Sequence, residues 1–410
     1  MSFFLTAFVL IILDTITVRG IKYIFPNFWI RHKSGIKTFF ILQVIFFLFF
    51  LMGGFFLQEH TRDYRVFTVY YYLFGLMVAL YSPKTIFAIS LVLDIIISRT
   101  GNKKRRSRNL SPKNPSHILA KCGMVTGVCM TLIIVWGILF GRYNYDVHHV
   151  QITFDDLPVK FDGFKIAQIS DVHAGSSAGM IHRFQKAVDL INQQAPDIIV
   201  FTGDMVNNFA EETYPLIPVF SGLKASGGKY AVMGNHDYGM YYKWKTPAEE
   251  KANIQNTEQA ITSMGFDLLN NRSVVIEKDS LNRIAVVGIE NWGIRDRHPK
   301  LGDIDIATDS VKDIPFKILL SHDPSFWAEK IKGKTDIPLT LSGHTHGMQI
   351  GARFGKRRFS PARMQYEYWA GLYQVNRQYL YVNRGLGVIA FPGRIGMPPE
   401  ITILELKRKD

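Results

Sequence analysis

Long runs of apolar residues with few charges dominate the first third of the chain. A helix needs about 20 such residues to cross a bilayer, because the hydrocarbon core is about 30 Å thick. We therefore predict an all-α transmembrane region over residues 1–142, with about four helices near residues 3–18, 36–57, 66–98 and 118–140. The third run is too long for one perpendicular crossing, so it is either a helix that kinks at Pro83 and extends beyond the bilayer or a tight pair of spans.

A different pattern begins at Phe164. Short apolar runs, typical of buried strands, alternate with polar or glycine-rich turns and with a helix-like stretch over residues 180–193. Strand-like runs occur at residues 164–169, 197–202, 229–233, 283–289, 316–320, 338–341, 379–382 and 401–406. This pattern predicts a layered α/β domain over residues 143–410.

Charge separates the same two regions. Residues 1–142 contain 17 Lys and Arg against 4 Asp and Glu, whereas residues 143–410 contain 31 against 30. The excess therefore indicates basic cytoplasmic loops between membrane spans, and no nucleic-acid partner is expected. Both cysteines, Cys122 and Cys129, lie in an apolar run, so the α/β domain has no disulfide.

The basic loops also predict an orientation. Cations cluster at residues 19–37 and 99–113, and loops of this kind stay in the cytoplasm. With four spans, both basic clusters lie on the cytoplasmic side of the membrane. A fifth span would place the more basic cluster, at residues 99–113, on the opposite side. We expect a multi-pass protein of the plasma membrane whose domain over residues 143–410 faces away from the cytoplasm. Asp14 and Asp94 interrupt apolar runs, where carboxylates are often functional, although each could instead sit near a span end.

Side chains able to bind metals follow five of the predicted strands, at the point where each strand ends. In chain order they are Asp171, His173, Asp204, Asn235, His236, His322, His344 and His346. Any one alone has a structural explanation as a turn, cap or buried residue. The carboxyl ends of strands in an open α/β sheet converge on one crevice, so we expect the set to share a site.

The size and chemistry of this set suit a pair of divalent metal ions. Two ions about 3.5–4 Å apart can hold the attacking and leaving oxygens of a displacement at phosphorus, and one carboxylate is commonly shared between them. Mixed imidazole, carboxylate and amide ligands favour manganese, iron or zinc over calcium, whose sites consist of oxygen. We therefore expect two divalent ions per chain.

The strand-end motifs resemble the signature blocks of the calcineurin-like metallophosphoesterases. The blocks are Asp171-Val172-His173, Gly203-Asp204, Gly234-Asn235-His236-Asp237, His322 and Gly343-His344-Thr345-His346. They follow the family's order over roughly residues 164–350, and the tail over residues 383–400 resembles the branch found behind N-terminal membrane helices. The resemblance implies a sandwich of two mixed β-sheets flanked by helices. Ser321 stands where the family often has glycine, which we interpret as a variation of the turn.

The resemblance also implies a role for each residue. One metal ion would take Asp171, His173, Asp204 and His346, and the second would take Asp204, Asn235, His322 and His344, with Asp204 bridging. His236 would protonate the leaving oxygen or stabilise the transition state, a role suited to imidazole. Asp237 would orient His236.

Residues after the last block are candidates for substrate contact. Arg384 and Arg394 could bind phosphate, since guanidinium matches it bidentately, but surface or structural roles are equally open. The aromatic segment at residues 238–244 is either packing or an apolar lip at the site.

These observations favour a membrane-anchored, metal-dependent phosphoesterase that attacks a phosphate ester with a metal-bridging hydroxide. The partners expected are the lipid bilayer and a phosphoester substrate, which membrane tethering allows to be lipid-linked. Two alternatives stay open: hydrolysis of a lipid-linked or nucleotide pyrophosphate, and a catalytically silent metal-binding sensor. The ligand set does not distinguish monoester, diester and pyrophosphate.

Overall fold

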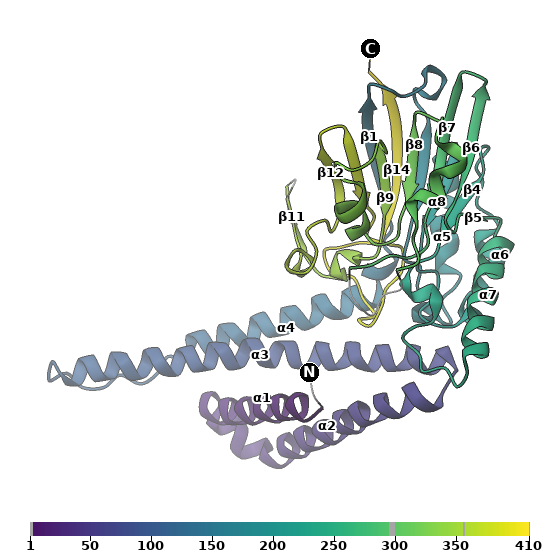
Figure 1. The fold of residues 1–410 in the computed structure, drawn as a ribbon. Helices are drawn as coiled ribbons and strands as arrows, with labels where there is room; N and C mark the ends of the chain where they lie inside the picture. Colours follow the sequence, from purple (N-terminus) through teal and green to yellow (C-terminus); the bar gives the residue numbers. More distant parts are fainter. Residues whose placement is uncertain (1–2, 295–299, 356, 410) are drawn as a thin grey trace. The chain divides into compact units, whose positions relative to one another are not determined.

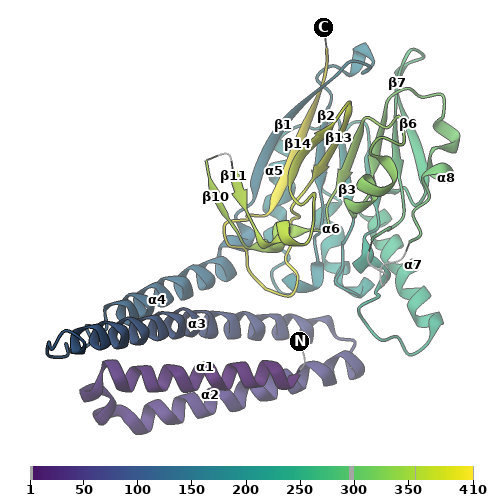
Figure 2. The same ribbon diagram turned by 60° about the vertical axis from the view of Figure 1, so that its left-hand side comes forward.

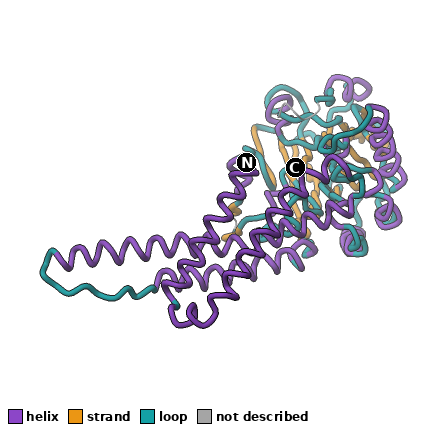
Figure 3. Tube along the Cα trace, turned by 90° about the horizontal axis from the view of Figure 1, so that it is seen from below, coloured by secondary structure: helices purple, strands orange, loops and turns teal. Residues whose placement is uncertain are grey.

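The computed structural model describes residues 3–294, 300–355 and 357–409. Within them the chain forms two compact units. The first comprises Met1–Thr61 and Val69–Leu139, and the second comprises Arg62–Thr68 and Phe140–Asp410. Figure 3 shows that the strands belong to the second unit, whereas the first is built from helices.

The first unit contains long apolar helices. They are α1 (Phe3–Ile24), α2 (Pro26–His60), α3 (Tyr64–Arg106, of which the first turn belongs to the second unit) and α4 (Ile118–Leu139). Three segments in these helices have the length and apolar composition to cross a membrane, namely Pro26–Gly54, Tyr64–Arg106 and Ile118–Tyr143. The third predicted run is one helix with Pro83 inside it. That α1 also crosses the bilayer stays a prediction.

Apolar side chains join these helices, and the carboxylates of Asp14 and Asp94 have basic neighbours. One cluster unites α1, α2 and α3 through Leu10, Phe47, Phe50 and Tyr81, and another unites α1, α3 and α4 through Ile24, Phe87, Leu91 and Ala120. Oδ1 of Asp14 lies 2.5 Å from Nζ of Lys84. Oδ2 of Asp94 lies 3.6 Å from Nδ1 of His117. The ion pair with Lys84 lowers the cost of burying Asp14 in an apolar bundle, whereas Oδ2 of Asp94 has no hydrogen-bond partner among the described residues.

The second unit contains two mixed six-stranded sheets and a small hairpin. The first sheet has the order β1 (Asp146–Phe154), β14 (Glu400–Arg408), β2 (Lys165–Ile169), β3 (Ile198–Thr202), β4 (Lys229–Val232), β5 (Asp267–Leu268). The second has the order β12 (Gly371–Val375), β13 (Gln378–Val382), β9 (Leu339–Ser342), β8 (Lys317–Leu320), β7 (Asn282–Gly288), β6 (Arg272–Asp279). The hairpin pairs β10 (Ala352–Phe354) with β11 (Arg357–Phe359). The sheets can be followed in Figures 1 and 2.

The sheets bury their apolar residues in three layers. A central core lies between the sheets, with Ile166, Val200 and Leu404 from one and Val286 and Leu339 from the other. The helices α5 (Arg183–Gln193), α6 (Ile217–Phe220) and α7 (Pro247–Ser263) cover the outer face of the first sheet, and α8 (Ile304–Thr308) with the π-helical turn Trp327–Ile331 covers the second. The predicted fold class, a sandwich of two mixed sheets flanked by helices, is confirmed.

Candidate metal centre

The predicted ligands gather where strands of both sheets end. In the first sheet β2, β3 and β4 are parallel neighbours, and in the second β8 and β9 are parallel neighbours. Asp171 and His173 follow β2, Asp204 follows β3, and His322 follows β8. The carboxyl ends of parallel strands lie at one edge of their sheet, so the packing of the two sheets brings both sets of loops together.

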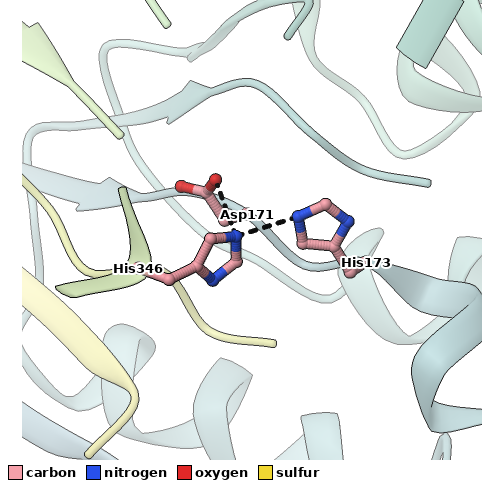
Figure 4. A group of neighbouring side chains, drawn as sticks. All are labelled: Asp171, His173 and His346. Carbon is pink, nitrogen blue, oxygen red and sulfur yellow. Dashed lines mark hydrogen bonds and ion pairs between the residues drawn. The ribbon is translucent and has the colours of Figure 1, made fainter. Parts of the chain in front are cut away.

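One group consists of Asp171, His173 and His346, whose ligand atoms lie within 4.8 Å of one another. Nε2 of His346 lies 3.0 Å from Nε2 of His173 and 3.2 Å from Oδ1 of Asp171. Figure 4 shows these ring nitrogens and the carboxylate turned toward one another. The group is buried, so charge placed among these atoms is largely shielded from water.

A second group consists of Asp204, His322 and His344. Nε2 of His322 lies 3.1 Å from Nδ1 of His344 and 3.1 Å from Oδ2 of Asp204. The same Oδ2 atom lies 3.6 Å from Nε2 of His173 in the first group. One carboxylate oxygen thus stands between the two groups.

Hydrogen bonds away from the centre orient two of the imidazoles. Nδ1–H of His173 donates to Oδ1 of Asn207 at 3.1 Å, and Nδ1–H of His322 donates to the carbonyl oxygen of Thr202 at 2.7 Å. With a proton held on Nδ1, Nε2 is the nitrogen directed into the cluster. When Nε2 carries no proton, its lone pair is the one that a metal ligand requires.

An unsatisfied amide provides a separate test of metal binding. Asn235 is buried, and its Nδ2–H donates to the Tyr241 hydroxyl at 2.8 Å. Its Oδ1 atom has no hydrogen-bond partner among the described residues. A buried acceptor of this kind costs about 1–3 kcal/mol unless something satisfies it. Carboxylate and imidazole groups that lie within 4.8 Å of one another, together with an amide oxygen that lacks a partner, form a ligand set that suits a divalent cation.

The electrostatics of the cluster also favour positive charge. Burial opposes charge on His322, but the carboxylate of Asp204 outweighs burial and raises the pKa of this imidazole to about 10. Burial also opposes ionisation of Asp171, yet the neighbouring His346 holds the pKa of this carboxyl well below its usual range. The two carboxylates therefore stabilise a cation at this point, whether a proton or a metal ion.

Known proteins are similar to this chain over the same residues. Residues 164–348 match the family model described as calcineurin-like phosphoesterase. An uncharacterized metallophosphoesterase of Bacillus subtilis is 33% identical over 65% of this chain and 90% of its own length. The chain belongs to the calcineurin-like phosphoesterases. It is therefore a metal-dependent phosphoester hydrolase by family.

Both parts of this phosphoesterase have counterparts. Residues 1–142 match a model described as the transmembrane domain of a probable calcineurin-like phosphoesterase, so the chain is a membrane protein. A transmembrane protein with metallophosphoesterase domain from Danio rerio is 26% identical over 76% of this chain and 68% of its own length. A dimetal phosphatase structure from Danio rerio is 11% identical, with a TM-score of 0.30 over 55% of this chain and 88% of that one. A likeness of that size says nothing about the chemistry of the site.

The backbone is unusual at the predicted ligands themselves. Five of them have left-handed backbone conformations, with φ of 51° at Asp171, 45° at His173, 62° at Asp204, 74° at His344 and 52° at His346. Such conformations cost on the order of 1–3 kcal/mol each in residues other than glycine. Gly343 permits the close approach of two of these loops, since a Cβ atom there would lie 2.4 Å from Oδ2 of Asp171.

His236 lies at the accessible side of the cluster. It is only partly buried, its Nδ1–H donates to the carbonyl oxygen of Asn207 at 2.7 Å, and its ring stacks on Tyr241 with centroids 4.2 Å apart. Burial lowers the pKa of His236. The imidazole therefore has a fixed orientation and a side open to a ligand.

The carboxylate of Asp237 contacts backbone N–H groups, whereas the resemblance implied that it contacts the ring of His236. The carboxylate of Asp237 accepts backbone N–H groups from Asp204 at 2.8 Å, Met205 at 2.7 Å, Val206 at 3.1 Å and Gly234 at 2.9 Å. In the described structure the ring of His236 is instead oriented by Asn207, because the backbone turns after β4 and directs Asp237 under the neighbouring loop. Asp237 thus shapes the loop that carries Asp204.

Sequence reasoning missed Asn207 and Glu212. Asn207 contacts both His173 and His236. The buried carboxylate of Glu212 accepts the N–H groups of Gly175, Asn207, Asn208 and Phe209, and burial raises its pKa to about 7. The segment Arg62–Thr68, which belongs to the same unit, contacts the loop that Glu212 binds. There the Thr68 hydroxyl donates to the carbonyl oxygen of Gly175. In the sequence, the local feature that could have pointed to the contacts of Asn207 is the pair Asn207-Asn208, which follows the Gly203-Asp204 block.

Arg384 and Arg394 are both buried. Arg384 forms an ion pair with Glu400, and its Nη2 lies 2.6 Å from Nε2 of His148. Arg394 donates to several backbone carbonyls, including that of Gly387, and its Nη2 lies 3.4 Å from Nδ1 of His346. These partners agree with the structural role that the sequence left open, and substrate contact stays a prediction.

The aromatic side chains at residues 238–244 differ in what they contact: one lies at the candidate site and others pack in the domain. Tyr241 lies at the site through His236 and Asn235. Tyr242 and Trp244 pack against Phe209 instead. Tyr241 is thus this segment's contact with the cluster, and the segment forms no continuous lip there; outside it, the Tyr366 hydroxyl lies 3.3 Å from Nε2 of His344.

Proposed function

We propose that this phosphoesterase binds two divalent metal ions, of manganese, iron or zinc, and hydrolyses a phosphate ester outside the cytoplasm while anchored in the membrane. The observation that carries the proposal is the place of Asp204, whose Oδ2 atom lies 3.1 Å from His322 and 3.6 Å from His173. A carboxylate shared in this way is what a two-metal site needs.

One ion would be held by Asp171, His173, Asp204 and His346. The other would be held by Asp204, Asn235, His322 and His344, where the orphaned Oδ1 of Asn235 would gain a partner. When bound, the pair would supply a bridging hydroxide as the nucleophile and neutralise charge on the phosphate.

His236 would act on the leaving group. Asn207 holds the proton on Nδ1 of His236, which leaves Nε2 to carry the transferred proton. Because the ring is partly exposed and packs at the edge of His173, with centroids 4.8 Å apart, a phosphate at the cluster would come within its reach. Protonation of the leaving oxygen at this position contributes about 10²–10⁴-fold to such reactions.

An activity panel tests the proposal. The full chain, purified in detergent and stripped of metal, is assayed with a phosphomonoester, a phosphodiester and a pyrophosphate, each with manganese, iron or zinc restored. We expect turnover that depends on added metal and saturates at two ions per chain. Metal binding without turnover on any substrate would support the silent sensor instead.

A second experiment tests the orientation. A reporter that is active only in the cytoplasm is fused after Asp410 and, in a control, within the basic loop near Lys104. We expect signal from the loop fusion alone. A cytoplasmic signal from the C-terminal fusion would contradict the proposed location of the catalytic domain.

A further inference from the structure

A cavity of about 660 Å³ lies within the membrane unit. Its wall is built from α1, α3 and the linker after α3, and consists of Ile16, Arg19, Gly20, Tyr23, Leu91, Val92, Ile95, Ser98, Arg99, Asn102, Lys103, Arg106 and Pro115. Small-molecule sites in proteins have volumes of about 300–1,000 Å³. The cavity is therefore large enough for part of a lipid.

The wall has an apolar part and a cationic part. Ile16, Leu91, Val92 and Ile95 form the apolar part, and four cations form the other, namely Arg19, Arg99, Lys103 and Arg106. The three α3 cations are spaced by four and three residues, so they share one face of the helix. No aspartate or glutamate is among the described lining residues. The division matches the hydrocarbon and phosphate parts of a phospholipid.

The four cations of this cavity have no ion-pair partner in the described part of the chain, whereas Lys84 in α3 pairs with Asp14. Cations held around one cavity repel one another, and an anion among them removes that cost. Guanidinium groups match the oxygens of phosphate bidentately.

We propose that this cavity binds an anionic phospholipid. Its phosphate would lie among Arg19, Arg99, Lys103 and Arg106, and an acyl chain would lie along Leu91, Val92 and Ile95. Basic pockets between membrane helices are known to suit anionic headgroups. The site is separate from the metal centre and does not depend on the proposed hydrolysis.

A second cavity that shares Arg19 adds apolar volume. This space of about 460 Å³ is lined by Arg19, Lys37 and Asp14, of which Asp14 pairs with Lys84, and by apolar side chains that include Val18, Phe40, Ile41 and Val44. The second cavity could therefore hold an acyl chain beside Arg19, the cation that lines both cavities. A site for free phosphate alone would not need it.

The test measures binding and does not use activity. The full chain is purified in dodecyl maltoside and titrated with dihexanoyl phosphatidylglycerol, dihexanoyl phosphatidylcholine and inorganic phosphate, and bound molecules are counted by native mass spectrometry. We expect phosphatidylglycerol to bind on the order of ten-fold or more tightly than phosphatidylcholine. Inorganic phosphate at the same concentration should not displace it.

Two triple variants locate the site. Arg99→Gln/Lys103→Gln/Arg106→Gln removes three cavity cations and should abolish the preference for phosphatidylglycerol. Lys104→Gln/Arg108→Gln/Lys113→Gln removes the same charge from the same loop but outside the cavity wall, and should retain the preference. Arg19→Gln changes a single cavity cation, which lies in α1, and should weaken phosphatidylglycerol binding several-fold. This variant tests the site even if the triple variant fails to fold.

Three results would overturn the proposal. Equal binding of the two lipids by the native chain would remove the charge preference. An equal loss in both triple variants would mean diffuse surface attraction rather than a site. Displacement by inorganic phosphate at matched concentration would show an anion site without a lipid component.

Discussion

The backbone carbonyl oxygen of Asn207 lies 2.7 Å from Nδ1 of His236, and the side-chain oxygen of the same residue lies 3.1 Å from Nδ1 of His173. One residue thus orients both a proposed metal ligand and the proposed acid. The two contacts use different parts of Asn207, so mutation can separate them.

Replacement of His236 tests its assignment as the acid rather than a ligand. We expect His236→Ala to lower kcat by about 10²–10⁴-fold while both metal ions stay bound, because only proton transfer is lost. Turnover of an aryl phosphate is measured beside metal content by plasma mass spectrometry. His182→Ala, an exposed histidine in the same unit, is the matched control and should change neither. Loss of metal from His236→Ala would show that the imidazole is a ligand.

Removal of the Asn207 side chain should affect metal affinity instead. Asn207→Ala keeps the carbonyl that holds His236 but loses the oxygen that holds His173, so we expect metal affinity to fall by about 10–100-fold. Excess metal should then restore most of the turnover. Asn208→Ala, which preserves the backbone contacts of the adjacent position, should leave the metal titration unchanged. Activity that excess metal fails to restore would contradict this division of roles.

Asp204→Asn should disturb both ions at once. The change retains the shape of the side chain but removes the charge that lies between the two groups. We expect metal content to fall at both sites and turnover to drop by at least about 100-fold, since loss of an outer partner alone costs up to that much. Asp189→Asn on the exposed face of α5 is the control. A variant that still holds two ions would rule out a bridging role.

Glu400 should make stability depend on acid pH. Burial opposes its ionisation, but Arg384 outweighs burial and lowers the pKa of this carboxyl to about 2. His148, Tyr381 and Thr402 also contact the pair. A lowered pKa in the folded state adds stability above the unfolded value of 4.5, and this stability is lost as pH falls toward 2.

The expected difference is on the order of 3 kcal/mol at neutral pH. We therefore predict that Glu400→Gln lowers the urea midpoint of the full chain strongly at pH 6–7 and progressively less as the pH falls below 4.5, because the native carboxyl becomes neutral first in the unfolded chain and, near pH 2, in the folded one. Tryptophan fluorescence reports the transition. Glu405→Gln on the same strand removes a partly exposed pair with Lys407 and should have a small effect throughout. A pH-independent deficit in Glu400→Gln would contradict the lowered pKa.

Buried strands and strand-end chemistry were accessible from the sequence because both are local. The predicted runs coincide within two residues with β2, β3, β4, β7, β8, β9, β13 and β14. The sequence did not predict the edge strands β1, β5, β6 and β12 or the hairpin strands β10 and β11. There one face is partly exposed, and mixed segments such as Arg272–Asp279 lack a continuous apolar run.

The sequence by itself determined which side chains gather at the candidate centre, since each predicted ligand follows a recognisable strand, and it determined the apolar helices by their length. Only the tertiary structure decided that one oxygen of Asp204 stands between the two groups, that Asn207 rather than Asp237 orients His236, and that Asp14 pairs with Lys84. These contacts join residues far apart in the chain or on opposite sides of a turn. Their distances depend on how two sheets or several helices pack, which no local pattern encodes.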